Sequence, residues 1–500
     1  MQKLPALMLT FLTTERLLVA ILVISSLLGI SGYSSDVFMH LVTGRHILTI
    51  TGLPTGDPFS FTNPGEGWVM HEWFYQLVLY LLFDAFGMAG LKIVGTGLLV
   101  ATLYFNKKNC QTLGASLIVA WATTIGLLVT WNQFIGVRPQ AITYFFFVLY
   151  LNSVLRYRYL HDIKGLYLLP LLMLVWVNSH GGFMAGIVLL AYMLLLHVIE
   201  TRLTGNGWHL DRPLLVTLIV TTAVSLINPN GYEQLMFPFQ LVDQWAIRYV
   251  TEWQAPRFTE WPYAIYLVVV SIFLMSSLFW VNKERWYRLA LTLPFIVASL
   301  QAVRHIPLAD FVFAPYLATQ IEDMVAAWKV RMTPGETRRE LGRVEYLFNW
   351  AVLACYGVAV AALYPVYSAA TQADIARRFP IGATNYLIEN NVHGRLFAPM
   401  EYSSYILFTR YPEQKVFYDV RIDRYGAAIS KHYMIMVNAL DGWQNLFKYY
   451  AIDYVVLDKS KPLYTAISSE HRFSLSYEDA TSAVFLLKNS PDSKLASTLS

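Results

Sequence analysis

The sequence has little charge and almost no cysteine. Only 14% of its 500 residues are Asp, Glu, Lys or Arg, against about 25% in an ordinary water-soluble domain. Its net charge of +4 is too small for the basic surface that non-specific nucleic-acid binding requires, so no nucleic acid is expected as a partner. Cys110 and Cys355 lie at the end of one apolar segment and inside another, which excludes a disulfide framework and a thiolate metal site.

The sequence also has no Gly-rich phosphate loop, no Walker motif and no internal repeat. In contrast, 56% of its residues are hydrophobic and its mean hydropathy is +0.44. Apolar segments close to the ~20 residues that cross a bilayer recur along the chain, which predicts a polytopic α-helical membrane protein. The eleven predicted spans are residues 17–34, 88–105, 112–131, 140–155, 165–178, 183–200, 213–227, 262–281, 288–303, 306–320 and 346–367.

Three segments allow another interpretation. The segment 165–178 is short for a span, and 288–320 can also form one long hairpin or a re-entrant pair. The segment 72–86 is apolar but interrupted and rich in aromatic residues, so we expect an interfacial helix there.

Charged residues become more frequent after residue 368. Residues 369–500 contain 27 charged side chains, whereas the much longer stretch 1–368 contains 43. This contrast predicts a membrane domain at 1–368, with outer loops at 34–72 and 228–261, and a water-exposed domain at 369–500. Helical and strand-like patterns alternate in the latter, for example TNYLIENN, KVFYDV and DYVVL, so we expect a small α/β domain.

Lys and Arg are distributed unequally between the two sides of the membrane. With the N-terminus inside, the inner segments hold 17 of them, and the outer segments before residue 369 hold six. The positive-inside rule therefore predicts a multi-pass protein of the inner (cytoplasmic) membrane, with a cytoplasmic N-terminus and an extracytoplasmic C-terminal domain. The first apolar segment lacks a convincing A-x-A site, so we expect an uncleaved anchor.

Under this topology the first outer loop carries several candidate site residues. Asp36 and His40 are four residues apart in a short amphipathic helix and share one face. Asp36 is a candidate base, and its alternative is a helix cap after two serines. His40 can orient Asp36, bind a divalent metal with it, or pack at the interface.

Later in the same loop, Asp57, His71 and Glu72 are candidate substrate-binding residues. Asp57 in GDPFS is also typical of a turn. His71 and Glu72 resemble half of a zinc-protease motif, but Tyr75 stands where the second His is required, which argues against a zinc site.

The other outer turns supply further ionisable side chains, which cost about 2.5 to 3.5 kcal/mol each at membrane depth and so indicate a function or a partner. Arg304 has no nearby acid before Asp310, which predicts an anionic ligand, and its alternative is snorkelling to lipid headgroups. The candidate ligands of an anion are Arg138, Arg257, Arg304 and His305. The remaining candidate substrate-binding residues are Asn178, His180, Glu252, Asp419 and Arg421.

Two of these groups have a structural alternative. Asn178 and His180 precede two glycines and can equally cap helix ends. Asp419 and Arg421 follow a predicted strand, where ligands often bind in α/β folds, but can equally form a salt-linked loop.

Several motifs, as a set, resemble the C-type glycosyltransferases, the GT-C superfamily. These are polytopic enzymes that use polyprenyl-phosphate-linked sugars. The likeness is to little-characterised bacterial members related to the protein O-mannosyltransferase and aminoarabinose transferase group, and it covers nearly the whole chain. The motifs are D-x3-H-x3-G at Asp36, His40 and Gly44, LPTGDPFSFT at 53–62, WVMHEW at 68–73, WVNSHGG at 176–182, NPNG at 228–231, TEWQAP at 251–256 and VFYDVRIDRYG at 416–426.

The resemblance implies that an acidic residue of the first loop, here Asp36, acts as the base toward the acceptor or positions a metal. Protein O-mannosyltransferase-like members often have adjacent acids, but Val37 follows Asp36, which leaves the acceptor and the need for Mg or Mn open. The W-W-D-Y-G signature of oligosaccharyltransferases is absent, so glycosylation of Asn is not implied.

The expected reaction is an inverting transfer of a sugar from a polyprenyl-phosphate donor in the membrane lipid to a glycan, lipid or protein acceptor. Arg304, Arg138 or Arg257 would stabilise the leaving phosphate, and Asp36 would take the proton of the acceptor hydroxyl.

Three other functions remain as alternatives. An O-antigen ligase or polymerase usually concentrates its functional residues in one late loop, whereas here the first loop is rich in them. A transporter would have more charges at mid-membrane depth and paired broken helices or an inverted repeat. A non-enzymatic scaffold would tolerate Asp36→Asn.

Overall fold

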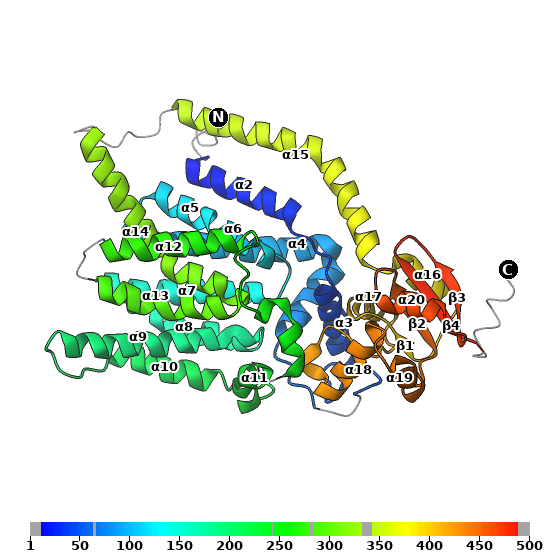
Figure 1. The fold of residues 1–500 in the computed structure, drawn as a ribbon. Helices are drawn as coiled ribbons and strands as arrows, with labels where there is room; N and C mark the ends of the chain where they lie inside the picture. Colours follow the sequence, from blue (N-terminus) through cyan, green and yellow to red (C-terminus); the bar gives the residue numbers. More distant parts are fainter. Residues whose placement is uncertain (1–11, 64–66, 243, 280–283, 333–342, 489–500) are drawn as a thin grey trace. The chain divides into compact units, whose positions relative to one another are not determined.

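The computed structural model describes residues 12–63, 67–242, 244–279, 284–332 and 343–488. The chain forms two compact units (Figure 1), each built from separate stretches of sequence. The first comprises Met1–Ser31, Leu91–Phe239 and Arg248–Tyr356, and the second comprises Gly32–Gly90, Gln240–Ile247 and Gly357–Ser500. The predicted domain boundary at residue 368 lies inside helix α15 (Arg343–Arg378), and the first outer loop belongs to the same unit as the C-terminal residues.

The first unit is helical, because its segments are apolar over most of their circumference and bury one side against neighbouring helices. In Figure 1 its helices α7 to α10 lie side by side, with contacts between α7 and α8, α8 and α10, and α9 and α10. Its helices are α2 (Thr14–Gly29), α5 (Leu117–Gly126), α6 (Leu128–Trp131), α7 (Gln140–Leu160), α8 (Lys164–Val177), α9 (Met184–Leu203), α10 (Arg212–Val224), α12 (Tyr263–Phe279), α13 (Arg285–Gln301) and α14 (Ile306–Met332). Helix α11 (Tyr232–Val242) begins in this unit and ends in the second. Short 3-10 helices connect these elements at η1 (Asn132–Phe134), η2 (Gly181–Phe183), η3 (Trp245–Tyr249), η4 (Thr251–Trp253) and η5 (Val303–His305).

Each of the eleven predicted spans overlaps a helix in its described residues, and 112–131 covers both α5 and α6. In the described part of the chain, four helical stretches are long and apolar enough to cross a membrane, and three more apolar helices are shorter. The four are Trp73–Thr112, Leu117–Phe134, Gly181–Leu203 and Glu345–Arg378, and the three are Lys164–Val177, Arg212–Val224 and Tyr263–Leu278. These lengths fit a multi-pass membrane protein, and the number of eleven spans stays a prediction. Four of the basic residues counted on the inner side, Lys3, Lys283, Arg338 and Arg339, lie outside the described residues.

Helix α4 (Trp73–Thr112) is interrupted at Gly87, whose φ of 58° and ψ of −148° are not helical. A positive φ favours glycine because it has no Cβ. The break lies between the predicted interfacial helix 72–86 and the predicted span 88–105.

The second unit contains a four-stranded sheet in the order β1-β2-β4-β3, which confirms a small α/β region near the C-terminus. Strand β1 pairs with β2 in parallel, and the other two pairings are antiparallel. Its elements are α3 (Ser35–Ile50), α16 (Ile381–Glu389), β1 (Leu396–Phe397), α17 (Met400–Arg410), η6 (Ile422–Arg424), α18 (Ala427–Val437), α19 (Trp443–Tyr449), β2 (Tyr454–Asp458), α20 (Pro462–Ser468), β3 (Phe473–Glu478) and β4 (Ser482–Leu487).

The first outer loop is joined to this sheet by backbone hydrogen bonds. Val416 N donates to Phe59 O at 3.0 Å, and Phe61 N donates to Val416 O at 3.1 Å. On its other side Val416 forms a parallel bridge with Leu396 of β1. Val416 therefore connects the loop to the edge of the sheet, and Phe59 is fully buried in the core of the unit.

Helix α3 is packed against α17, and the two lie close together in Figure 1. The ring of Phe38 contacts those of Tyr405 and Phe408, each with a centroid distance of 5.1 Å. Arg45 donates to the backbone oxygens of Phe408 and Tyr411. The helix that carries Asp36 is thus fixed to the C-terminal part of the chain.

Candidate active site

Helix α3 begins after a serine cap and carries two predicted site residues. The hydroxyl of Ser34 accepts a hydrogen bond from Val37 N at 3.1 Å and so caps the helix. Asp36 lies in the first turn and is partly exposed, where the helix dipole favours a carboxylate. The capping function belongs to Ser34, so the helix does not need Asp36 for it.

His40 lies one turn further along the same face and is buried. Its Nδ1 is 3.3 Å from Gln76 Nε2 and 3.7 Å from Glu72 Oε2. The ring of Tyr75 meets the imidazole edge-on, with 5.7 Å between centroids. These contacts favour an imidazole that is oriented by the first turn of α4.

Gly44 extends the stripe of Asp36 and His40 by one more turn. A Cβ at Gly44 would lie 2.2 Å from the backbone oxygen of Gln76 and 2.7 Å from Tyr80 Cβ. Only glycine lets α3 and α4 approach so closely, which gives the D-x3-H-x3-G motif a physical reason.

The order of these contacts gives the relative direction of the two helices. Gly44 contacts Gln76 and Tyr80, and His40 contacts the earlier residues Glu72 and Gln76. The helices therefore run in the same direction here, and Asp36 points toward the start of α4. In agreement, the charges of Glu72 and Asp36 both act on the hydroxyl of Tyr75.

Glu72 lies between two imidazoles. Its Oε1 is 3.5 Å from His71 Nε2, and its Oε2 faces His40. Burial opposes a charge on His71, but the carboxylates of Glu72 and Asp423 outweigh it and raise the pKa of His71. For Asp423 burial is the largest effect and raises its pKa despite His71 and Arg421 nearby. The arrangement therefore favours a protonated His71 beside the Glu72 carboxylate.

Asp57, Asp419 and Arg421 form a buried ionic network. Arg421 binds both oxygens of Asp419, at 3.0 Å from Nε and 2.6 Å from Nη2, and its Nη2 donates to Asp57 at 2.9 Å. Asp57 also accepts hydrogen bonds from Phe59 N and from the hydroxyl of Ser60, which confirms the predicted turn. Burial opposes ionisation of Asp57, but Arg421 and these hydrogen bonds together lower its pKa. The salt-linked loop is thus the better description of this group.

In the first unit, Arg138 and Arg304 belong to one polar cluster. Arg138 pairs with Glu252, and the guanidinium of Arg304 lies 4.1 Å from the ring centroid of Trp253. The hydroxyl of Tyr144 is close enough to feel the charges of Arg304, Glu252 and Arg138. The structure therefore brings together two predicted anion ligands and Glu252.

Two other predicted anion ligands have different surroundings. The side chain of Arg257 is 72% exposed and its described partner is Glu260, at 3.7 Å. The Nδ1 of His305 lies 3.1 Å from the backbone oxygen of Ala298, at the end of α13.

Asn178 and His180 make contacts that fit their capping alternative. Asn178 Nδ2 donates to Leu174 O at 2.8 Å and to Ile227 O at 3.0 Å. His180 Nδ1 accepts from Gly182 N at 3.0 Å and lies 2.7 Å from Thr143 Oγ1. Both residues therefore satisfy backbone groups where the chain passes from α8 to α9.

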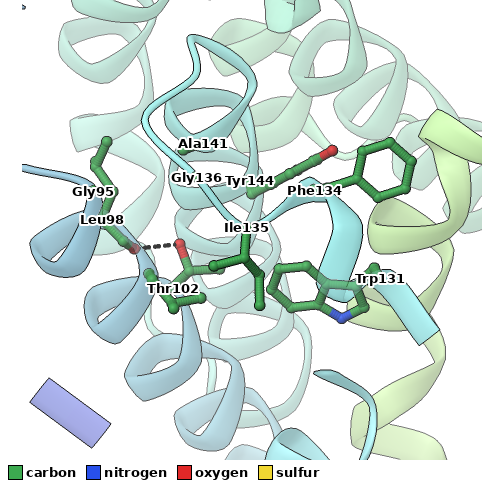
Figure 2. A pocket seen from close by; sticks show the side chains of 10 residues that line it. Gly95, Leu98, Thr102, Trp131, Phe134, Ile135, Gly136, Ala141 and Tyr144 are labelled. Carbon is green, nitrogen blue, oxygen red and sulfur yellow. Dashed lines mark hydrogen bonds between the residues drawn. The ribbon is translucent and has the colours of Figure 1, made fainter. Parts of the chain in front are cut away.

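An apolar pocket in the first unit shares Tyr144 with the arginine cluster. The pocket is small, with a volume of about 20 Å³, and its wall includes the indole of Trp131 and the phenol of Tyr144 (Figure 2). The hydroxyl of Thr102 turns to the backbone oxygen of Leu98, at 2.7 Å. The lining residues are Gly95, Leu98, Leu99, Thr102, Trp131, Phe134, Ile135, Gly136, Ala141 and Tyr144.

A divalent metal at Asp36 and His40 stays a prediction. Within the described residues, no three His, Cys, Asp or Glu side chains come together as a metal site would require. The Nδ1 of His40 faces Glu72 and Gln76.

The sequence interpretation did not identify Tyr75 and Gln76 as site residues. The signal for Gln76 was the stripe of Glu72, Gln76 and Tyr80 at intervals of four, which matches the stripe of α3 across the contact at Gly44. Asp423 was noticed only as part of a charged segment, because its neighbour His71 is distant in the sequence.

No protein-family model matches the chain, and no curated protein matches it either. Solved structures do match. The oligosaccharyltransferase of Archaeoglobus fulgidus, solved with a tethered acceptor peptide, is 12% identical with a TM-score of 0.57, over 88% of this chain and 68% of that one.

Two further structures are similar. AglB, the oligosaccharyltransferase of A. fulgidus in complex with an inhibitory peptide and a dolichol-phosphate, has a TM-score of 0.55 and 12% identity over 95% of this chain and 74% of that one. ArnT of Cupriavidus metallidurans in the apo state has a TM-score of 0.50 and 12% identity over 94% and 96%. The chain therefore has the fold that these solved structures share, in agreement with the fold that the sequence resemblance predicted.

Proposed function

We propose that the protein is a membrane glycosyltransferase that moves a sugar from a polyprenyl-phosphate donor to an acceptor hydroxyl on the extracytoplasmic face. The observation that carries the proposal is the cluster of Arg138 and Arg304, with the apolar surface that includes Tyr144 beside it, in a chain with this fold. A lipid phosphate needs both parts, a guanidinium for its headgroup and an apolar surface for its first isoprene units.

The arginine cluster suits a phosphate that gains charge during the reaction. A guanidinium has five N–H donors, so Arg138 can hold Glu252 and still bind an oxyanion. Arg304 lies against Trp253, and a cation–π contact of this kind orients the guanidinium. Similarity to AglB, whose structure holds a dolichol-phosphate, supports this class of donor.

In the proposed reaction, the acceptor oxygen attacks the anomeric carbon while the bond from that carbon to the phosphate oxygen breaks. The proton of the acceptor hydroxyl passes to the carboxylate of Asp36, and the polyprenyl phosphate leaves with the bonding electrons. A single displacement of this kind inverts the anomeric centre. The position of Asp36 in the first turn of α3, partly exposed and close to Glu72, supports its assignment as the base.

The test is transfer by the full chain in proteoliposomes, measured as release of polyprenyl phosphate from a panel of polyprenyl-phosphate-linked hexoses with hydroxyl acceptors. We expect Asp36→Asn to slow transfer by about 100-fold or more, because a general base contributes that much. Asp84→Asn is the matched control, since Asp84 is exposed on α4, and it should keep wild-type activity. Normal transfer by Asp36→Asn at normal expression would refute the assignment.

The assignment of Arg304 to the binding site of the donor phosphate is tested separately with Arg304→Met. Loss of a charge-assisted hydrogen bond of about 1.5 to 3 kcal/mol should raise the KM for the donor roughly 10-fold to 100-fold. Arg202→Met, in the last turn of α9, is the control and should leave this KM unchanged. An unchanged donor KM in Arg304→Met would exclude Arg304 from the phosphate site.

A further inference from the structure

Two buried polar atoms beside Asp36 and Glu72 have no partner in the described structure. The hydroxyl of Tyr75 belongs to a side chain that is only 3% exposed, and Gln76 Oε1 to one that is 5% exposed. A buried polar group without a hydrogen bond destabilises a protein, so such atoms are rare unless a ligand completes them.

Both side chains lie beside the two acidic residues Asp36 and Glu72. Tyr75 and Gln76 follow Glu72 by three and four positions, so they extend from the same face of the start of α4. Gln76 uses its Nε2 on His40, which leaves its Oε1 as the acceptor that is not used. The hydroxyl of Tyr75 lies where the charges of both Glu72 and Asp36 act on it.

From this placement we infer that Tyr75 and Gln76 form a binding site for the acceptor hydroxyl, an inference that rests on the proposed transferase function. The hydroxyl of Tyr75 donates to the acceptor oxygen, and the acceptor O–H donates to Gln76 Oε1 until Asp36 takes its proton. Tyr75 and Gln76 are thus binding residues, and neither exchanges a proton with the substrate.

The chemistry of the four side chains selects this class of ligand. A phosphate or carboxylate would be repelled by Asp36 and Glu72. An ammonium group has no lone pair to accept the proton of Tyr75. An alcohol donates once and accepts at the same oxygen, so it satisfies both atoms that lack a partner.

The decisive variant is Tyr75→Phe, because a hydroxyl without a partner and a hydroxyl with a structural bond predict opposite effects on stability. Removing an unpaired buried hydroxyl should raise the thermal midpoint of the ligand-free protein by about 1 to 4 °C. The same change should raise the KM for the acceptor about threefold to tenfold, the effect of one lost hydrogen bond, and leave kcat within about twofold. Measurements use the full chain in lipid nanodiscs without glycoside detergents, whose hydroxyls would compete.

Tyr80→Phe is the matched control, since Tyr80 lies on the same helix and packs against Gly44, and it should change neither quantity. A lower midpoint for Tyr75→Phe, or an unchanged acceptor KM, would overturn the inference. So would transfer to an asparagine-containing peptide that depends on Tyr75, because a carboxamide would then be the ligand. If Asp36→Asn transfers normally, the proposed function fails, whereas the midpoint of Tyr75→Phe still reports whether its hydroxyl lacks a partner.

Discussion

Arg421 is buried against two carboxylates. Asp419 lies two residues before it, whereas Asp57 belongs to the first loop and is distant in the sequence. It also lies 4.9 Å from the ring centroid of Phe59 and 4.7 Å from that of Trp68. A guanidinium can bind two carboxylates and stack on aromatic rings at once, which an ammonium cannot do.

Replacing Arg421 by Met should destabilise the second unit by about 3 to 5 kcal/mol, because Asp57 and Asp419 would stay buried without a cation. Chemical unfolding of the purified protein, followed by fluorescence, measures this. Arg377→Met is the control, since Arg377 forms an exposed pair with Asp374 that contributes about 1 kcal/mol at most. A loss no larger than that of the control would show that the network is not a source of stability.

The surroundings of His71 predict a dependence of stability on pH. The groups that act on it are Glu72, Asp423 and the backbone oxygen of Val69. Because its pKa is raised in the folded state, its contribution is fully present below pH 6.5 and is lost as the pH rises through the folded value. The thermal midpoint should fall above pH 6.5, and His71→Gln should remove that decline. The same decline in the variant would assign it to another group.

For single residues, the sequence predicts candidate site residues, but it does not predict the partners that these residues contact. The turn at Asp57 follows from the local Gly-Asp-Pro sequence. Its ion pair could not be predicted, because Arg421 lies 364 residues further on. Likewise the lack of a nearby acid predicts an anion for Arg304, but its contact with the ring of Trp253 could not be predicted, because the two residues lie in different turns.

At the scale of elements, the crossing of α3 and α4 determines the site geometry. Gly44 lets the backbones approach until His40 reaches Glu72 and Gln76. The shared face of Asp36 and His40 was predictable from their spacing on a helix. The partner helix was not, because periodicity within one segment says nothing about which segment packs against it.

Gly44→Ala should therefore disturb the site. Its Cβ would meet the backbone oxygen of Gln76 at 2.2 Å, so the helices must move apart, which destabilises by about 1 to 3 kcal/mol. Transfer activity should fall with it. Gly97→Ala on α4 is the control, because its Cβ meets nothing within 4 Å, and alanine in a helix is favoured by up to about 1 kcal/mol. Equal thermal midpoints for the two variants would show that the crossing tolerates a methyl group.

At the scale of the whole molecule, hydropathy locates the apolar helices, whereas the domain division at residue 368 stays a prediction. Each predicted span overlaps a helix because a bilayer requires long apolar segments that satisfy their own backbone. The position of the first loop in the sequence assigns it to the membrane domain, but its backbone forms hydrogen bonds with that of Val416. Such pairing depends on contacts across the chain that composition cannot show.

The predicted topology is tested by cysteine labelling of intact cells in a Cys110→Ser, Cys355→Ser background. Ser469→Cys in the exposed part of the C-terminal region should react with a membrane-impermeant maleimide. Thr204→Cys, exposed between α9 and α10 on the side predicted to be cytoplasmic, should react only after the cells are opened. The reverse pattern would invert the topology and move the proposed chemistry to the cytoplasm.

The attachment of the first loop to Val416 also has a consequence for biosynthesis. Thr62 donates a hydrogen bond to the backbone oxygen of Phe417, 355 residues later, so the loop is synthesised long before the ribosome has made its partners. Until then its strand-like backbone has only water or a chaperone to bind. Folding of the first loop must therefore wait until the residues after α15 have been made, and a nonsense mutation near the 3′ end of the gene would leave the loop near the start of the protein unfolded as well.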